Sequence, residues 1–244
     1  MGFFHRFTNY ARAKGKTTLR LVHKESGDPL KLPKEARLGI YDTRDAMFLP
    51  FVEGKDVLEL GCGWGYDTFL LSSKAKTVTG IDVNKSAIEK ASKRFAYVSN
   101  IIFVNDNILS FIDKGKKFDV VVLFESLEHL SYEEQKVLVR KLWQVLNPHG
   151  QLFLSTPNGE CVPLYRKNPY HKRELSIIEL ESLLSSHFKI EVIKGQVPIV
   201  WFFIPLPWDV IEKIWLFFGI YEKMCKLRNN PINCRTVIIR AVRK

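Results

Sequence analysis

One stretch constrains the fold of this chain more than any other feature. Residues 57–65 read VLELGCGWG, a short apolar run that leads into three closely spaced glycines. The apolar run is typical of a strand buried on both faces of a parallel sheet, and residues 66–73 read as the helix that follows. Glycines at this junction let the backbone turn sharply and come close to a ligand. A strand, a glycine turn and a helix in this order place a ligand at the carboxyl end of the strand, so we predict an α/β fold with a binding site there.

An acidic residue ends the next apolar run. Asp82 follows residues 77–81 and lies 21 residues after Gly61. A carboxylate about 20 residues beyond the loop is placed to accept hydrogen bonds from ribose hydroxyls, as in enzymes that use NAD or S-adenosylmethionine. The nicotinamide fingerprint needs a third glycine where this chain has Tyr66. Glu59, two residues before Gly61, is placed to meet the ammonium group of an amino-acid-like ligand. A tight turn without a ligand is the alternative, which this combination disfavours.

Three separate motifs resemble those of one known family. They read ELGCGWG at 59–65, GIDVNKSAI at 80–88 and FDVVVLFESLEHL at 118–130. With these motifs, residues 35–194 resemble the class I S-adenosylmethionine-dependent methyltransferases, in particular the O-methyltransferases of quinone biosynthesis and the methyltransferases of glycan and glycolipid pathways. The likeness to the glycan group rests on STPN at 155–158 and NPYHKREL at 168–175. The resemblance implies S-adenosylmethionine as the cofactor and an α/β, Rossmann-like fold with a seven-stranded, mostly parallel sheet.

The other elements are predicted from apolar periodicity and from helix start and stop signals. The expected helices are 84–97 with Asn84 as N-cap, 132–146 closed by a turn at 147–150, and 176–187 with a capping box from Ser176 to Glu179. The expected strands are 101–104, 118–124, 151–154, 189–193 and 236–242. Together with the first two strands they make the seven that the resemblance implies.

The chain divides into four predicted parts. They are a basic N-terminal segment (1–33), an S-adenosylmethionine-binding core (34–194), an apolar helical insertion (195–230) and the final strand of the core (231–244). The net charge is +11, and both ends are basic while the middle is nearly neutral. Basic ends suit an anionic membrane surface, nucleic acid or a phosphate-bearing substrate, and solubility alone is an equal alternative. The uncharged stretch at 195–208 is too short to span a bilayer, so the insertion is expected to be a lid, a membrane contact or a partner interface.

The resemblance implies a cofactor site built at the ends of successive strands. The implied residues are Glu59, Gly61, Cys62, Gly63, Gly65, Asp82, Val83, Asp106, Asn107, Ile108, Phe124 and Glu125. By resemblance, Asp106 holds the adenine amino group, with Asn107 and Ile108 beside the ring. A surface turn is the alternative for Asp106, but its place after a strand repeats that of Asp82 and favours the ligand role. A helix expected over 34–51 covers the site in the resembled family, which brings Tyr41 and Arg44 near the cofactor.

Two histidines are candidate catalytic bases. A hydroxyl acceptor must lose a proton during methyl transfer, which calls for a general base, and His129 and His171 are placed to serve. A structural histidine at a helix start is the equal alternative for His129. Glu125, Glu128 and His129 also resemble the ExxEH stretch of quinone-type O-methyltransferases, where a divalent cation can bind. Three ligands close in sequence are a weak signal, so we assign no metal.

We predict a methyltransferase that acts on a hydroxyl of a small-molecule or lipid-linked acceptor. After the fourth strand, the chain lacks the Asn/Asp-Pro-Pro-aromatic tetrapeptide of many enzymes that methylate the amino groups of bases, which disfavours N-methylation of nucleic acid. The four cysteines form no CxxC pair and the N-terminus lacks the apolar core of a signal peptide, so we expect a cytoplasmic protein, peripheral at the inner membrane face. The alternatives are an RNA or protein methyltransferase that uses the basic ends, a non-catalytic membrane-associated scaffold, and a nicotinamide enzyme. No oligomeric state is predicted.

Overall fold

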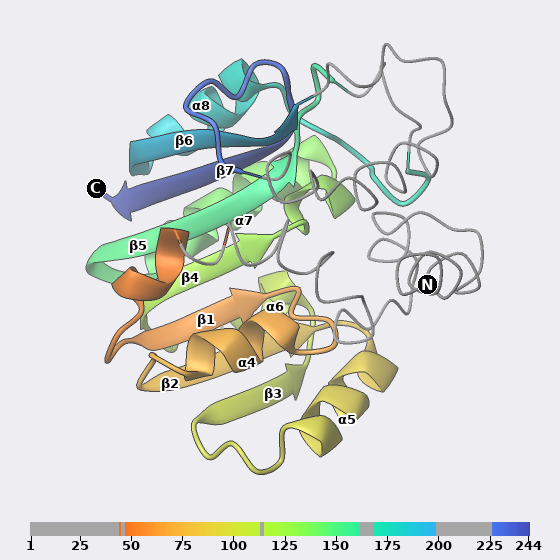
Figure 1. Cartoon of the computed structure of the whole chain (residues 1–244), viewed down its shortest axis with the longest axis vertical. Coiled ribbons are helices and arrows are strands. Elements are labelled where there is room, and N and C mark those ends of the chain that lie inside the picture. The colour runs from red at the N-terminus through yellow and green to blue at the C-terminus, as the bar shows by residue number, and fades with distance from the viewer. Residues whose placement is uncertain (1–43, 45–46, 113–114, 162–167, 199–225) are drawn as a thin grey trace, which may run out of the picture.

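A seven-stranded sheet forms the centre of the molecule. The computed structural model describes residues 44, 47–112, 115–161, 168–198 and 226–244. The strands follow the order β3-β2-β1-β4-β5-β7-β6 across the sheet (Figure 1). Their bounds are β1 Asp56–Leu60, β2 Thr77–Asp82, β3 Ile101–Asn105, β4 Phe118–Phe124, β5 Leu146–Pro157, β6 Phe188–Pro198 and β7 Cys234–Arg243. The neighbours from β3 to β5 pair in parallel, and β7 runs antiparallel to both β5 and β6. The predicted α/β fold with a mostly parallel sheet is confirmed.

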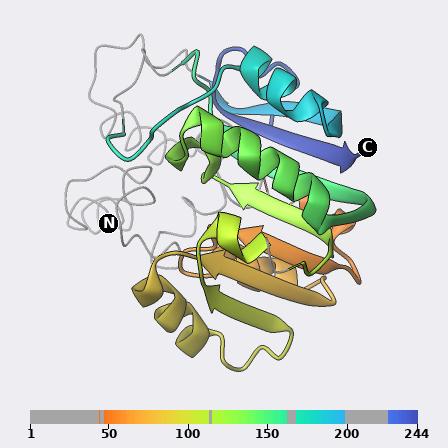
Figure 2. The same cartoon turned by 180° about the vertical axis from the view of Figure 1, so that it is seen from behind.

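Helices cover both faces of the sheet. They are α4 Tyr66–Ser72, α5 Lys85–Arg94, α6 Ile108–Ile112, α7 Tyr132–Val145 and α8 Ile177–Ser185, with short 3-10 turns η2 Leu49–Phe51 and η3 Leu127–His129. In Figure 1, α4 lies in front of the sheet, whereas the view from behind in Figure 2 brings α7 and α8 to the front. Side-chain alternation explains the layers, because successive strand residues point to opposite faces.

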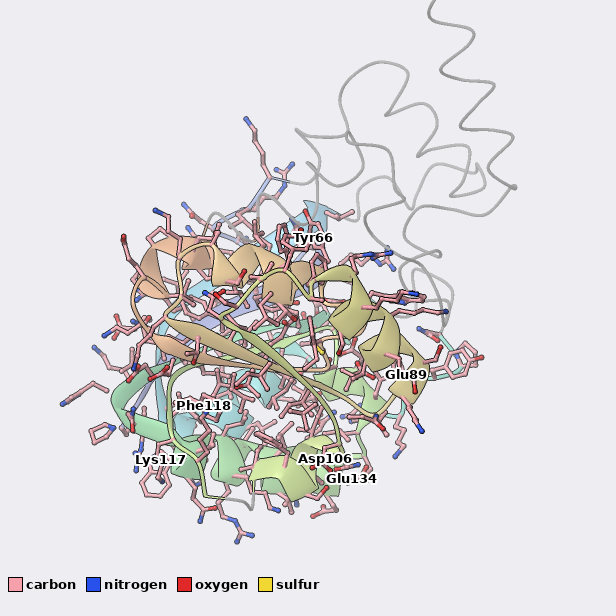
Figure 3. All side chains as sticks on the ribbon, turned by 90° about the horizontal axis from the view of Figure 1, so that it is seen from below. Tyr66, Glu89, Asp106, Lys117, Phe118 and Glu134 are labelled. Atoms are coloured by element: carbon pink, nitrogen blue, oxygen red, sulfur yellow. The ribbon has the colours of Figure 1, made fainter. Side chains whose placement is uncertain are left out.

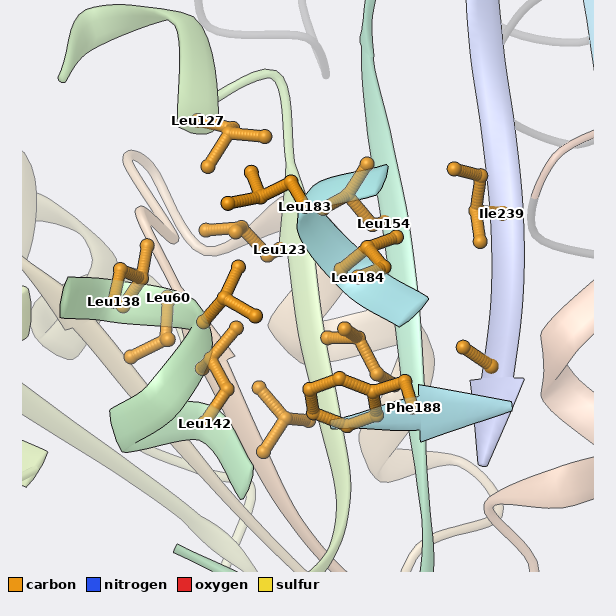
Figure 4. Packing of buried hydrophobic residues seen from close by; sticks show 14 of the residues in the cluster. Leu60, Leu123, Leu127, Leu138, Leu142, Leu154, Leu183, Leu184, Phe188 and Ile239 are labelled. Atoms are coloured by element: carbon orange, nitrogen blue, oxygen red, sulfur yellow. The ribbon is translucent and has the colours of Figure 1, made fainter. Parts of the chain in front are cut away.

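The two faces have separate cores. Leu58 and Leu60 of β1 pack with leucines of α7 and α8 in one cluster, part of which is shown in Figure 4. Val57, which precedes Leu58 in β1 and points to the opposite face, packs instead with Leu71 of α4 and with Phe48 in the other cluster. In the view from below, Lys117 lies at the periphery while its neighbour Phe118 is buried (Figure 3). The sheet is therefore buried on both faces, as its apolar strands predict.

Local capping signals set where the helices begin. The Asn84 side chain accepts a hydrogen bond from Ala87 N at 3.1 Å, which confirms it as the N-cap of α5. Ser176 and Glu179 form the predicted capping box at the start of α8. Such a cap contributes about 1 kcal/mol, because it satisfies backbone N–H groups that the first turn leaves without partners.

Strands β5 and β6 extend well beyond their predicted bounds. Residues 147–150 do not form a turn after α7; they lie within β5, which already pairs with Phe118 of β4 at Leu146. The ladder shifts register between Phe118 and Val120, and His149 takes φ +61°, so this stretch of β5 is irregular and carries the turn-like residues that predicted a helix end. β6 continues to Pro198, so residues 195–198 of the predicted insertion pair with β7.

Several predictions fall outside the described residues. These are the basic segment 1–33, Tyr41 and most of the 195–230 insertion. In the part of the chain that the structure describes, no helix has the length and apolar character needed to cross a bilayer.

Candidate functional site

The glycine loop is held against the end of β2 by Asp82. One oxygen of the Asp82 carboxylate accepts from Gly63 N at 2.8 Å, and the other accepts from Asn84 N at 2.8 Å. Gly61 N and Cys62 N both donate to the carbonyl of Ile81, at 2.8 and 2.9 Å. A carboxylate offers about four lone-pair sites, so Asp82 can brace the loop and still accept from two ribose hydroxyls.

The three glycines of the loop serve different purposes. All have positive φ, of +79°, +50° and +76° in chain order. A Cβ on Gly61 would lie 2.1 Å from Ser126 Oγ, and one on Gly65 would lie 2.5 Å from the Phe103 ring. A Cβ on Gly63 would meet nothing within 4 Å. Gly61 and Gly65 are therefore required for packing, whereas Gly63 leaves space where a ligand can approach the backbone.

Glu59 lies beneath the loop as a buried acid. It is 3% exposed, and the hydroxyl of Thr68 on α4 donates to its carboxylate. Burial raises the pKa of Glu59 to about 8, and the negative charge of Asp67 adds to the effect. At neutral pH the group is therefore largely protonated and supports the loop from inside the fold. Its predicted contact with a ligand's ammonium group stays a prediction, and no sequence pattern indicated Thr68 as its partner.

Cys62 and Arg44 complete the support of the site. Cys62 is buried, burial raises its pKa, and its Sγ would lie 3.1 Å from a Cβ built on Gly80. Arg44 is 3% exposed and pairs with Asp67 at 2.6 Å. Its guanidinium also lies 3.9 Å from the centroid of the Phe124 ring. Arg44 thus joins the chain before β1 to α4 and to the end of β4.

The tips of β2 and β3 lie together, as their acidic residues predict. Asp106 N donates to the carbonyl of Asp82 at 3.2 Å, and Asn105 Nδ2 donates to the same carbonyl at 2.9 Å. The Asp106 carboxylate accepts from Asn107 N at 2.7 Å and faces the start of α6, whose first residue is Ile108. Val83 beside them is 73% exposed, which leaves an apolar surface next to two acceptor groups. An adenosine group suits this combination of apolar face and hydrogen-bond acceptors.

The end of β4 carries a strained residue. Glu125 has φ +45°, which is uncommon for a residue other than glycine. Its N–H donates to the carbonyl of Ser155 at 2.9 Å, and the Ser155 hydroxyl donates to its carboxylate at 2.8 Å. These two bonds from β5 hold the strained turn, and such strain is concentrated at functional sites. Ser155 belongs to the STPN motif, so this motif contributes support to the site.

Glu128 and His171 meet although they are far apart in sequence. Glu128 is fully buried, accepts from the Thr156 hydroxyl at 3.2 Å and has one carboxylate oxygen without a hydrogen-bond partner in the described structure. Burial raises the pKa of Glu128 well above its usual value. The partnerless oxygen lies 3.8 Å from His171 Nε2.

His129 has the chemistry of a base. Its Nδ1 lies 3.1 Å from the carbonyl of Tyr170. A carbonyl can only accept, so Nδ1 carries the proton and Nε2 keeps the lone pair in the neutral ring. Burial lowers the pKa of His129, and the neighbouring His171 ring adds to this. His129 is therefore neutral at pH 7, and Nε2 has no hydrogen bond to any residue that the structure describes.

The nitrogens of His171, the other predicted base, have partners. Nε2 lies 3.0 Å from Asn168 Nδ2, and Nδ1 contacts the Glu174 carboxylate. A base needs a lone pair that faces the acceptor, and both ring nitrogens of His171 already face protein groups. Its base role stays a prediction that this arrangement does not favour.

The structure brings together a different set of potential cation ligands from the one that the sequence suggested. Glu125 bonds to Ser155, and the ligand atoms that lie within 4.8 Å of one another belong to Glu128, His129 and His171. The His171 lone pair that would serve a cation is already directed at Asn168. A cation would also need the ionised form of Glu128, which burial disfavours. The donor set does not suit a metal in this arrangement.

Comparisons with known proteins agree on one class. Residues 57–150 match a family model described as a methyltransferase domain. A protein of Mycolicibacterium smegmatis, named as a probable S-adenosylmethionine-dependent methyltransferase, is 35% identical over 145 residues, which are 57% of this chain and 53% of that protein. A ubiquinone biosynthesis O-methyltransferase of Coxiella burnetii is 30% identical over 108 residues, 44% of this chain and 45% of that protein. The chain spans about half the length of these curated relatives.

A solved structure shows the same fold. The N-methyltransferase NodS of Bradyrhizobium japonicum, in complex with S-adenosylhomocysteine, superposes with a TM-score of 0.62 at 18% identity. The match covers 92% of this chain and 95% of that one. At this identity the likeness concerns the fold, and it extends well beyond the residues that the family model matches.

Proposed function

Because this chain has the class I S-adenosylmethionine-dependent methyltransferase fold with a methyltransferase domain at residues 57–150, we propose that it transfers a methyl group from S-adenosylmethionine to a hydroxyl of a small-molecule or lipid-linked acceptor. The observation that carries the proposal is the neutral imidazole of His129 at the carboxyl edge of the sheet, with its Nε2 lone pair uncommitted among the described residues. The relative named as a ubiquinone biosynthesis O-methyltransferase supports an oxygen acceptor.

The cofactor is held by groups that the loop leaves available. Asp82 accepts from the ribose hydroxyls while it braces Gly63, and Val83 with Asp106 receives the adenine. Gly63 lets the backbone approach the ligand because no side chain intervenes. Bound S-adenosylmethionine supplies a methyl group that its sulfonium already activates. Proximity and orientation then account for much of the rate.

His129 removes the proton that a hydroxyl acceptor must lose. A positioned general base contributes roughly 10²–10⁴-fold to a rate. Its Nε2 accepts the hydroxyl proton as the oxygen attacks, and the Tyr170 carbonyl stabilises the imidazolium through Nδ1–H. The lowered pKa keeps His129 in the unprotonated form before the reaction.

A transfer assay with a matched variant tests the proposal. The full chain is incubated with methyl-labelled S-adenosylmethionine and with fractionated lipid, glycan and phenolic extracts, and products are sought by mass spectrometry as a gain of one CH₂. His129→Asn keeps an amide N–H at the position of Nδ1 but removes the basic Nε2. We expect this variant to bind S-adenosylmethionine with unchanged affinity and to lose roughly 10²–10⁴-fold in turnover. Transfer at the wild-type rate, or transfer to nitrogen alone, contradicts the hydroxyl proposal.

A place at the inner membrane face is a separate part of the proposal. It is supported by the basic segment 1–33 and the uncharged stretch 195–208, which lie mainly outside the described residues. Sedimentation of the full chain with anionic and with neutral vesicles across a salt series tests it. Binding only to anionic vesicles, weakened by salt, is the expected result. Equal recovery in the supernatant with both vesicles contradicts it.

A further inference from the structure

The loop that follows the STPN motif is fastened to the segment that carries His129. Lys172 N and Arg173 N both donate to the carbonyl of Glu128, at 2.9 and 3.2 Å. Gln135 of α7 is fully buried and donates to the Arg173 carbonyl at 2.9 Å. Residues 168–174, which we call the Asn168 loop, are therefore held against the residue next to His129.

Inside the Asn168 loop, three side chains fix one another. Asn168 Oδ1 accepts from Tyr170 N at 3.1 Å, which orients the amide so that its Nδ2 faces His171. Nδ2 can only donate, so His171 Nε2 at 3.0 Å must carry a lone pair. The His171 proton is then on Nδ1, which donates to the Glu174 carboxylate. The side chains of His171 and Glu174 are only 6% and 8% exposed, so water hardly competes for these bonds.

This arrangement determines where the Tyr170 carbonyl lies. Tyr170 stands between Asn168, which holds its N–H, and His171, whose ring is 5.0 Å from that of His129 and almost perpendicular to it. The carbonyl is thereby directed at His129 Nδ1, 3.1 Å away. The Tyr170 side chain takes no part, since it is 53% exposed.

We propose that Asn168, His171 and Glu174 are positioning residues that fix the tautomer of His129. They hold the Tyr170 carbonyl so that Nδ1 is protonated and Nε2 is left as the acceptor. The tautomer follows from the geometry alone, and its effect on turnover rests on the proposed function. The choice of tautomer decides whether the ring can act as a base toward the acceptor, because only an unprotonated nitrogen accepts a proton.

Imidazole NMR of the full chain tests the proposal without any acceptor. With ¹⁵N-labelled histidine, we expect wild-type His129 to show a protonated Nδ1 and an unprotonated Nε2. Asn168→Ala and Glu174→Ala are expected to shift His129 toward the opposite tautomer or a mixture. Glu174→Gln keeps an oxygen that can accept from His171 and should retain the wild-type pattern. Tyr170→Ala is the matched control, since it removes the exposed side chain and leaves the carbonyl in place.

The signals of His149 and His187, which lie outside the Asn168 loop, and the unfolding midpoint report whether each variant is folded. If the Asn168→Ala loop does not fold, Glu174→Ala compared with Glu174→Gln decides the question. An unchanged His129 tautomer in folded Asn168→Ala and Glu174→Ala variants overturns the proposal, as does a wild-type His129 protonated on Nε2. Titration with Zn²⁺ alone adds a third refuting result, namely one-to-one binding that shifts His129 and His171 together.

Measuring kcat together with the His129 tautomer distinguishes a failure of the positioning role from a failure of the proposed function. In the shifted variants, kcat should fall by part of the roughly 10²–10⁴-fold that a general base supplies, while the Kd for S-adenosylmethionine stays within about twofold. A shifted tautomer with unchanged kcat supports the positioning role and contradicts the base role of His129. A fall in kcat with an unchanged tautomer overturns the positioning role.

Discussion

Gly61 gives a quantitative test of how the glycine loop is packed. Its φ is +79°, and a Cβ there would lie 2.1 Å from Ser126 Oγ and 3.1 Å from Ser126 Cβ. Alanine at this position meets two separate penalties. A left-handed backbone costs a non-glycine residue roughly 1–2 kcal/mol, and overpacking a well-filled site adds roughly 1–3 kcal/mol. We therefore expect Gly61→Ala to lower the free energy of unfolding by about 2–5 kcal/mol.

Two further variants separate the strain from the collision. Gly54 has φ +67° but nothing within 4 Å of its Cβ, so Gly54→Ala carries the backbone strain alone, roughly 1–2 kcal/mol. Ser126→Gly in the Gly61→Ala background removes both colliding atoms. The double variant should regain roughly 1–3 kcal/mol over Gly61→Ala, once the effect of Ser126→Gly alone is subtracted in a double-mutant cycle.

Urea unfolding of the four variants and the wild type, followed by circular dichroism, measures these energies. Equal losses in Gly61→Ala and Gly54→Ala would refute the reasoning, because the two sites share the backbone strain and differ in the neighbouring side chain. A cycle without coupling between Gly61 and Ser126 would refute it as well. Reduced cofactor affinity without reduced stability would show that Gly61 serves the ligand instead of the packing.

Three other predictions follow from the site. In the folded chain the pKa of Glu59 is raised from 4.5 to about 8, so between these pH values the folded chain holds a proton that the unfolded chain has released, and the free energy of unfolding falls as the pH rises. Glu59→Gln should remove up to about 1.4 kcal/mol of this loss per pH unit, measured by urea unfolding at pH 5–8. Identical slopes of unfolding free energy against pH in the variant and the wild type would contradict the prediction. Asp82→Asn should raise the Kd for S-adenosylmethionine roughly 10- to 100-fold by calorimetry, because charge-assisted hydrogen bonds are lost, and unchanged affinity would count against the ribose role. Asn158, directly after β5, is buried, and its Nδ2 donates to the carbonyl of Cys234, so Asn158→Ala should lower the free energy of unfolding by roughly 1–3 kcal/mol and leave the affinity for S-adenosylmethionine unaltered. A loss of affinity with unchanged stability would instead show that Asn158 serves the ligand.

Local signals account for what the sequence predicted well. The bounds of β4 match the prediction residue for residue, and Asn84 caps α5 as expected. Both features depend on residues close in sequence: β4 is an almost unbroken apolar run, and the Asn84 side chain accepts from the N–H of the residue three positions further along. The placement of Asp82 and Asp106 at adjoining strand tips follows from the parallel order of β2 and β3, which the motif spacing already implied.

Contacts between distant segments account for what was missed. The turn expected at 147–150 lies inside β5, in the irregular stretch between Leu146, which pairs with Phe118 of β4, and Gln151, which pairs with both β4 and β7. Glu125, Glu128 and His129, which were considered for a cation without one being assigned, do not converge, because the Ser155 hydroxyl from another strand donates to the Glu125 carboxylate. No spacing in the sequence gives the distance between such segments.

By itself, the sequence determined the strand–glycine–helix unit, the acids at the strand ends and hence the edge of the sheet where a ligand is bound. Only the tertiary structure decided the state of each group at that edge. Glu59 is protonated at neutral pH because the core buries it and the negative charge of Asp67 lies nearby, and His129 presents Nε2 because the Tyr170 carbonyl of the Asn168 loop, 41 residues further along the chain, lies against its Nδ1. Residue type and order fix which groups are present, whereas protonation and tautomer depend on burial and on partners that only the folded chain brings within hydrogen-bonding distance.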